Sequence, residues 1–174
     1  MNVRWTQRNP RWTWLAAAAV LLFVDQLSKS YFSTRLELGE AIQVTEWLNF
    51  VHVLNAGAAF SFLADAGGWQ RWFFIGVTVV VVGVVSVACL ARQAEPLDRW
   101  VGAFVVGGGG GNLVDRVQIG AVVDFLDLHW GGIHWPAFNM ADVFIVGSVL
   151  VWCFASLKSP PRQSPRKPPE ESHS

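Results

Sequence analysis

The stretch Trp72–Ala91, WFFIGVTVVVVGVVSVACLA, contains no charged residue. A helix needs about 20 predominantly apolar residues to cross a bilayer, and this run reaches that length on its own. Three shorter uncharged runs, Trp12–Val24, Trp100–Val114 and Val143–Leu157, reach it when each extends into the polar cluster beside it. The sequence therefore predicts a membrane protein with four helical spans. We place these spans over residues 12–32, 70–91, 99–117 and 139–157.

The composition agrees with a membrane location. Of the 174 residues, 52% are hydrophobic and 15% are charged, whereas soluble domains carry roughly 25% charged residues. The net charge of zero argues against a nucleic-acid-binding protein, and the hydrophobicity excludes a disordered chain. Cys89 and Cys153 both lie inside apolar runs, so we interpret them as packing residues and not as a disulfide or as metal ligands.

Lysine and arginine residues are concentrated on one side of the predicted spans. The N-terminus, the loop over residues 91–99 and the C-terminal tail together hold most of the 13 Lys and Arg residues. Because short cytoplasmic loops are enriched in Lys and Arg, we expect both termini to be cytoplasmic. We also expect residues 1–157 to form a single membrane domain and residues 158–174, rich in proline, serine and basic residues, to be a disordered cytoplasmic tail.

Two segments, residues 33–69 and 118–138, then lie on the opposite side of the membrane. In the first, the apolar residues around Trp47 and over Val51–Leu54 predict short strands. Phe60–Ala66 is predicted to form a short helix on the membrane surface.

Aspartates on three different spans are predicted to reach the same depth. At 1.5 Å per residue from the cytoplasmic ends, Asp25 lies about 21 Å deep, and Asp115 and Asp142 lie about 24 Å deep. This is near the outer edge of an apolar core about 30 Å thick. Asp124 follows Asp115 closely enough to fold back to that level. Four further polar residues border the same zone: Asn55, Asn112, Arg116 and Asn139.

Some of these charges can be explained as structural ion pairs. Asp25 and Lys29 are spaced i, i+4 on one helix, and Asp115 is followed directly by Arg116. Charged groups within a membrane are costly, by about 2.5–3.5 kcal/mol each on insertion scales, so pairing is a sufficient reason for these four.

Asp124 and Asp142 have no adjacent basic residue, so they need another explanation. Two close carboxylates share a proton, so that one can act as a base on water while the other acts as an acid toward a carbonyl. The histidines show no spacing typical of a metal site, and we expect neither a metal nor a cofactor. The glycine run Gly107–Gly111 lacks the strand and the Lys-Ser/Thr of a nucleotide loop, and it is typical of close helix packing in membranes.

Five motifs carry a family resemblance. In chain order they are DQLSK (Asp25–Lys29), NAGAAFS (Asn55–Ser61), GNLVDR (Gly111–Arg116), VVDF (Val122–Phe125) and FNMAD (Phe138–Asp142). Together they resemble the lipoprotein signal peptidase family, also called signal peptidase II, and the resemblance covers about residues 12–157. The departures are small: Gly109 and Gly110 lengthen the glycine run, and Ala56 occupies a variable position.

The resemblance implies an aspartic endopeptidase of the bacterial inner membrane, with its active site near the periplasmic face. Its substrates would be prolipoproteins, cut just before a diacylglyceryl-modified cysteine, without a cofactor. The family's catalytic dyad falls on Asp124 and Asp142. Other motif positions are expected to bind substrate or support the dyad, and they fall on Asn55, Asn112, Arg116, Asn139, Asp115, Asp25 and Lys29.

The resemblance also implies a small periplasmic β-cradle and a surface helix over residues 33–69. We therefore expect an all-α membrane protein of four transmembrane helices with these two additions. We expect it to be a monomer that contacts membrane lipids. The alternative from the residues alone is a small proton-coupled transporter, because carboxylates within spans also form proton relays. The nearly apolar cytoplasmic halves, Leu15–Phe23 and Val77–Val87, disfavour it.

Within the dyad, the two aspartates are expected to differ. Asp142 would lie in the first turn of a helix, where the helix dipole favours the ionised form. Asp124 lies among Val122, Val123 and Phe125, which favour the neutral form by desolvation. We therefore expect Asp142 to carry the charge and Asp124 to carry the shared proton in the free enzyme.

Overall fold

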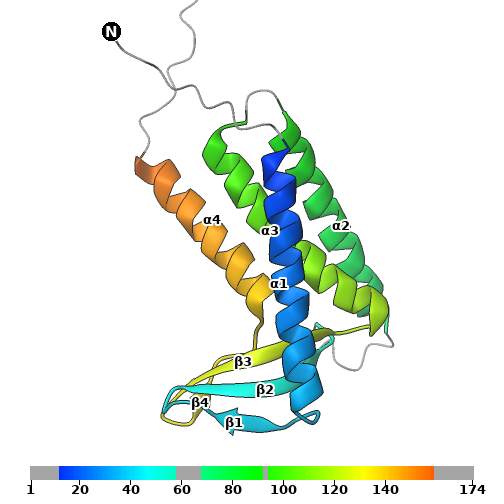
Figure 1. Ribbon diagram of the computed structural model, residues 1–174, viewed down its shortest axis with the longest axis vertical. Helices are drawn as coiled ribbons and strands as arrows, with labels where there is room; N and C mark the ends of the chain where they lie inside the picture. The colour runs from blue at the N-terminus through cyan, green and yellow to red at the C-terminus, as the bar shows by residue number, and fades with distance from the viewer. Residues whose placement is uncertain (1–11, 58–67, 92–93, 159–174) are drawn as a thin grey trace, which may run out of the picture.

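The computed structural model describes residues 12–57, 68–91 and 94–158 (Figure 1). Within these ranges four helices form a bundle, and four strands form a sheet at one end of it. The helices are α1 (Thr13–Arg35), α2 (Trp69–Leu90), α3 (Pro96–Gln118) and α4 (Met140–Lys158). The strands are β1 (Ala41–Gln43), β2 (Leu48–Asn55), β3 (Val122–Trp130) and β4 (Ile133–His134).

Helix α3 packs against all three other helices, and its glycines allow this. A Cβ atom at Gly107 would lie 2.7 Å from the carbonyl oxygen of Ala18 on α1. At Gly108 it would lie 2.6 Å from the carbonyl oxygen of Ala141 on α4. Both distances are too short for a real side chain, so the prediction that the glycine run serves close helix packing is confirmed.

Three helices of the described chain, α1, α2 and α4, are long and apolar enough to cross a membrane. The protein is therefore a multi-pass membrane protein. The remaining predicted span corresponds to α3, which has 23 residues but is less apolar. Most of its glycines and its polar residues Asn112 and Asp115 are buried against the other helices and the sheet, so they lower the hydropathy of α3 without being exposed to the membrane.

The sheet is antiparallel with strand order β1-β2-β3-β4. The all-α class is therefore incomplete as a description, but the expected small β-cradle is present as this sheet, which also includes strands from residues 122–134. The expected strand over Val51–Leu54 is part of β2, whereas Trp47 lies just before β2. The local sequence does not predict strand β3, which pairs with β2, with Val53 opposite Asp124, and with β4. The predicted surface helix, Phe60–Ala66, and the tail beyond residue 158 lie outside the described residues.

Aromatic rings attach the sheet to the bundle. The ring of Phe32, near the end of α1, stacks on Phe125 of β3 with a centroid distance of 4.4 Å. Phe32 also contacts Phe50 of β2 at 4.6 Å. Because Phe125 directly follows Asp124, this contact places Asp124 at the junction of the bundle and the sheet.

Candidate active site

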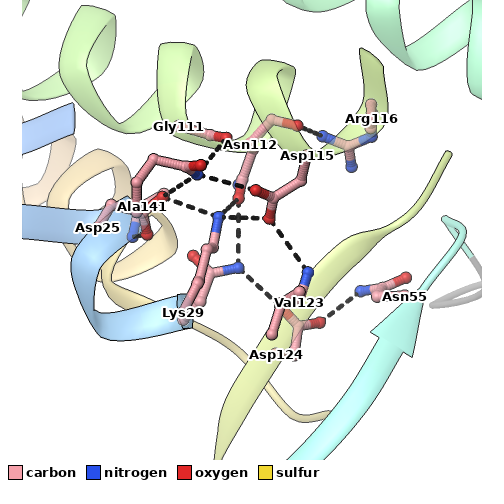
Figure 2. A network of polar contacts seen from close by, with 12 residues as sticks. Asp25, Lys29, Asn55, Gly111, Asn112, Asp115, Arg116, Val123, Asp124 and Ala141 are labelled. Carbon is pink, nitrogen blue, oxygen red and sulfur yellow. Dashed lines mark hydrogen bonds and ion pairs between the residues drawn. The ribbon is translucent and has the colours of Figure 1, made fainter. Parts of the chain in front are cut away.

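The polar residues singled out from the sequence meet where the sheet joins the helices (Figure 2). Five elements supply them. Asp25 and Lys29 lie on α1, Asn112, Asp115 and Arg116 on α3, Asn55 at the end of β2, Asp124 on β3, and Asn139 and Asp142 at the start of α4.

Asp124 is almost fully buried, with 1% of its surface exposed. Its Oδ1 accepts a hydrogen bond from Nδ2 of Asn139 at 2.6 Å, and its Oδ2 accepts one from Nδ2 of Asn55 at 2.9 Å. Burial raises the pKa of Asp124 to about 6, although these two hydrogen bonds favour the ionised form. The negative charge of Asp142 raises this pKa further. Asp124 can therefore hold a proton at a pH where an ordinary carboxyl group has lost it.

Asp142 lies in the first turn of α4 and is only partly buried. Its Oδ1 accepts a hydrogen bond from Nδ2 of Asn112 at 2.9 Å. Its Oδ2 accepts one from the backbone N–H of Asn139 at 3.2 Å, while its own N–H donates to Oδ1 of Asn139 at 3.1 Å. This reciprocal pair caps the helix, and the helix N-terminus favours a carboxylate there. The surroundings of the two aspartates thus differ, because Asp124 is buried and Asp142 is partly exposed at the start of a helix.

Asn139 connects the two carboxylates and is completely buried. Its side-chain amide donates to Asp124 and also to Oδ1 of Asn112 at 3.2 Å. Its backbone N–H donates to Asp142. One residue therefore sets the position of both acidic side chains.

Lys29 forms the centre of a second, buried network. Its Nζ lies 2.8 Å from Oδ2 of Asp25 and 2.9 Å from Oδ2 of Asp115, and it donates to Oδ1 of Asn112 at 2.8 Å. The predicted pair of Asp25 and Lys29 is confirmed. Asn112 also donates to Oδ1 of Asp142, so it links this network to the Asp142 carboxylate.

The expected pairing of Asp115 with Arg116 is wrong. Asp115 pairs with Lys29, and its Oδ2 also accepts the backbone N–H of Val123 at 3.1 Å. Adjacent residues on a helix point about 100° apart, so one of them can face the interior while the other does not. Arg116 donates to the carbonyl oxygen of Asn112 at 3.4 Å, and its guanidinium lies 5.2 Å from the centre of the Phe74 ring.

Three hydrogen bonds of this network are not predicted by the sequence. Nε2 of Gln26 donates to Oδ1 of Asp115 at 2.8 Å and to the carbonyl oxygen of Gly111 at 3.1 Å. The backbone N–H of Ala141 donates to Oδ1 of Asp25 at 2.9 Å. The sequence does indicate Gln26, because it is a polar residue next to Asp25 within an apolar span. The sequence cannot indicate the Ala141 contact, because every residue except proline has a backbone N–H.

The arrangement suits acid–base chemistry on a carbonyl group. Asp124 is desolvated and Asp142 lies at a helix N-terminus, so a single proton on the pair would leave an acid beside a base. Among the described residues, no group of three or more His, Cys, Asp or Glu side chains is arranged to hold a metal ion.

Comparisons with known proteins agree with one another. The family described as signal peptidase (SPase) II matches residues 17–158. The chain is 46% identical over 153 residues to a lipoprotein signal peptidase of Tolumonas auensis, covering 86% of this chain and 92% of that protein. It is 47% identical over 157 residues to a lipoprotein signal peptidase of Shewanella halifaxensis, covering 87% and 89%.

Two solved structures share the fold. A bacterial membrane enzyme determined by the in meso method at 1.9 Å resolution superposes with a TM-score of 0.74 and 27% identity, covering 85% of this chain and 94% of that chain. A second bacterial membrane enzyme, determined by the same method at 2.3 Å, gives a TM-score of 0.75 at 26% identity, covering 89% and 93%.

Proposed function

The chain belongs to the signal peptidase II family of aspartic peptidases, and we propose that it hydrolyses prolipoproteins with a dyad formed by Asp124 and Asp142. The bond that is cut lies just before a cysteine that carries a diacylglyceryl group. Lipoprotein signal peptidase activity itself follows from membership of the family.

The single observation that carries the dyad is the bridge through Asn139. Asn139 hydrogen-bonds to Asp124 through its side chain and to Asp142 through its backbone. The remaining aspartates of the cluster, Asp25 and Asp115, are engaged by the ammonium group of Lys29. A carboxylate held by a buried cation is a poor general base, which leaves Asp124 and Asp142 for chemistry.

The proposed reaction uses one proton on the pair. Ionised Asp142 removes a proton from water, and the water oxygen attacks the scissile carbonyl carbon. Protonated Asp124 donates its proton to the carbonyl oxygen, giving a neutral diol. When the diol collapses, Asp124 takes back a hydroxyl proton, and Asp142 gives its proton to the nitrogen of the departing cysteine. The carbon–nitrogen bond breaks, and the dyad again holds one proton on Asp124.

The position of the site suits a lipid-anchored substrate. Asp124 and Asp142 lie at the end of the bundle that carries the sheet, not in the middle of the helices (Figure 1). We place this end at the periplasmic face of the inner membrane, with both termini in the cytoplasm. There the diacylglyceryl group of the substrate stays at the depth of the bilayer while the scissile bond reaches the dyad and water.

The activity can be tested with purified protein and one synthetic prolipoprotein in two forms. One form carries a diacylglyceryl group on the cysteine, and the other carries a free thiol. Mass spectrometry of the products should show a single cut before the modified cysteine and no cut in the free-thiol form. Equal cleavage of both forms would contradict the proposed specificity.

A further inference from the structure

An apolar groove runs along α4 from the candidate active site. A cavity of about 390 Å³ lies in the corner between α4 and the sheet, with Asp142 in its wall. Leu128 and Phe138 form the sheet side of this cavity, and Val146 and Leu150 form the α4 side. From Asp142 to Leu150 the groove follows about 12 Å of the helix.

A second apolar cavity adjoins the first. It has a volume of about 380 Å³ and lies between α3 and α4, where Phe104 and Val151 line it. Both cavities have Val143 and Gly147 in their walls. Because α4 is one of the helices long and apolar enough to span the membrane, the groove lies at the depth of lipid acyl chains.

We propose that this groove binds an acyl chain of the diacylglyceryl group on the substrate cysteine. The inference rests on the proposed function, because that function supplies a lipid-modified substrate. The chain enters beside Asp142 and lies along Val143, Val146, Gly147 and Leu150. In this position it holds the modified cysteine next to the dyad.

The shape and lining of the groove favour an acyl chain over the apolar part of the signal peptide. A helical peptide is about 10–12 Å wide, so it needs a much wider groove than a single acyl chain. An extended peptide would need hydrogen-bond partners in a nearly apolar wall. An acyl chain needs neither.

Charge favours the substrate lipid over a membrane phospholipid. The one ionisable side chain in the wall of the first cavity is that of Asp142. A phosphate group beside this carboxylate would be repelled, whereas a diacylglyceryl thioether carries no charge. The acyl chain gains little hydrophobic free energy by leaving the bilayer for the groove, so the groove acts mainly by positioning.

Gly147 offers a way to fill the groove without disturbing the fold. A Cβ atom at Gly147 would meet no protein atom within 4 Å, so Gly147→Leu places its side chain in open space along the groove. Gly83 on α2 is equally open and does not line either cavity, so Gly83→Leu is the matched control.

The experiment measures kcat/KM for one lipidated peptide carrying either two palmitoyl chains or two butanoyl chains. Displacing a reacting bond by about 1 Å can lower a rate about 100-fold. We expect Gly147→Leu to lower kcat/KM at least about tenfold for the palmitoyl substrate and less than about twofold for the butanoyl substrate. Gly83→Leu should resemble wild type with both substrates.

Two results would overturn the proposal. Unchanged cleavage of the palmitoyl substrate by Gly147→Leu would show that the groove holds only membrane lipid. An equal loss with both substrates, in a protein of unchanged thermal stability, would show that the groove takes peptide. A failure of the proposed function is distinct, because wild type would then cleave neither lipidated peptide.

Discussion

Nδ2 of Asn139 lies 2.6 Å from Oδ1 of Asp124, and Asn139 has no exposed surface. The same residue caps helix α4 by exchanging hydrogen bonds with Asp142. The start of a helix and the geometry of the proposed dyad therefore depend on one side chain, and the two roles can be separated by substitution.

We predict that Asn139→Ser keeps most of the stability but loses activity. Serine is a good N-cap, so the helix start is preserved, but its short side chain cannot reach Asp124. Asp124 becomes a carboxylate when it gives its proton to the substrate, and losing a hydrogen bond to a charged group costs about 1.5–3 kcal/mol, so kcat/KM should fall about 10- to 100-fold. Asn139→Ala should lose the same activity and, in addition, about 1 kcal/mol of unfolding free energy. Full activity of Asn139→Ser would contradict the bridging role.

The Lys29 network makes a prediction about stability. Lys29→Met leaves the carboxylates of Asp25 and Asp115 buried without their cation, which should cost about 3–5 kcal/mol of unfolding free energy. The triple variant Asp25→Asn/Lys29→Met/Asp115→Asn removes the charges together and should be more stable than Lys29→Met alone. Denaturant unfolding in detergent measures both. A Lys29→Met protein as stable as wild type would show that the network does not support the fold.

Two neighbouring glycines of α3 should respond in opposite ways to alanine. Gly108→Ala brings its Cβ within 2.6 Å of the Ala141 carbonyl oxygen, so α3 and α4 must separate and stability should fall by about 1–3 kcal/mol. Gly110→Ala meets only Cδ1 of Leu22, at 2.9 Å, and that flexible side chain can move. Alanine also favours a helix over glycine by about 1 kcal/mol, so Gly110→Ala should be neutral or stabilising. The melting temperatures of the two variants, each compared with wild type, test this prediction.

The pH dependence of cleavage follows from the pKa of Asp124, which burial raises to about 6. The proposed reaction needs Asp124 protonated and Asp142 ionised. In the free enzyme kcat/KM should therefore fall as the pH rises through about 6, and should also fall in acid, where the pair binds a second proton. The expected profile is bell-shaped, and its two apparent pKa values belong to the pair and not to either residue alone. A rate that rises through one ionisation and stays flat to high pH, with unchanged substrate binding, would exclude a shared proton.

The sequence predicted the meeting of the aspartates better than it predicted their partners. Helical rise alone brings Asp25, Asp115 and Asp142 to one depth. In the structure Lys29 contacts Asp25 and Asp115, and Asn112 bonds to both Lys29 and Asp142. The partner of Asp115 depends on which way α3 faces α1, and this is set by the tertiary packing of the glycine run. Spacing along one helix therefore identified the Asp25–Lys29 pair and missed the Lys29–Asp115 pair.

Strand β3 shows a second limit of the sequence. Its nine residues pair with β2, which lies far away in the chain, across a register irregularity between Phe50 and Val53. Local periodicity contains no information about that pairing. Asp124 was therefore recognised by its motif and its lack of a basic neighbour, whereas its hydrogen bond to Asn55 could not be derived.

The most direct test of the account is cleavage of a purified diacylglyceryl prolipoprotein by Asp124→Asn and Asp142→Asn. An amide keeps the shape of each side chain but cannot exchange the proton, and loss of acid–base catalysis typically costs about 10²–10⁴-fold. Asp127→Asn is the matched control, because Asp127 also lies on β3 but bonds to Asn49 and His134, outside the dyad. We predict that both dyad variants remain folded and lose cleavage, whereas Asp127→Asn retains most of it. Near-normal turnover by either folded dyad variant would contradict the assignment.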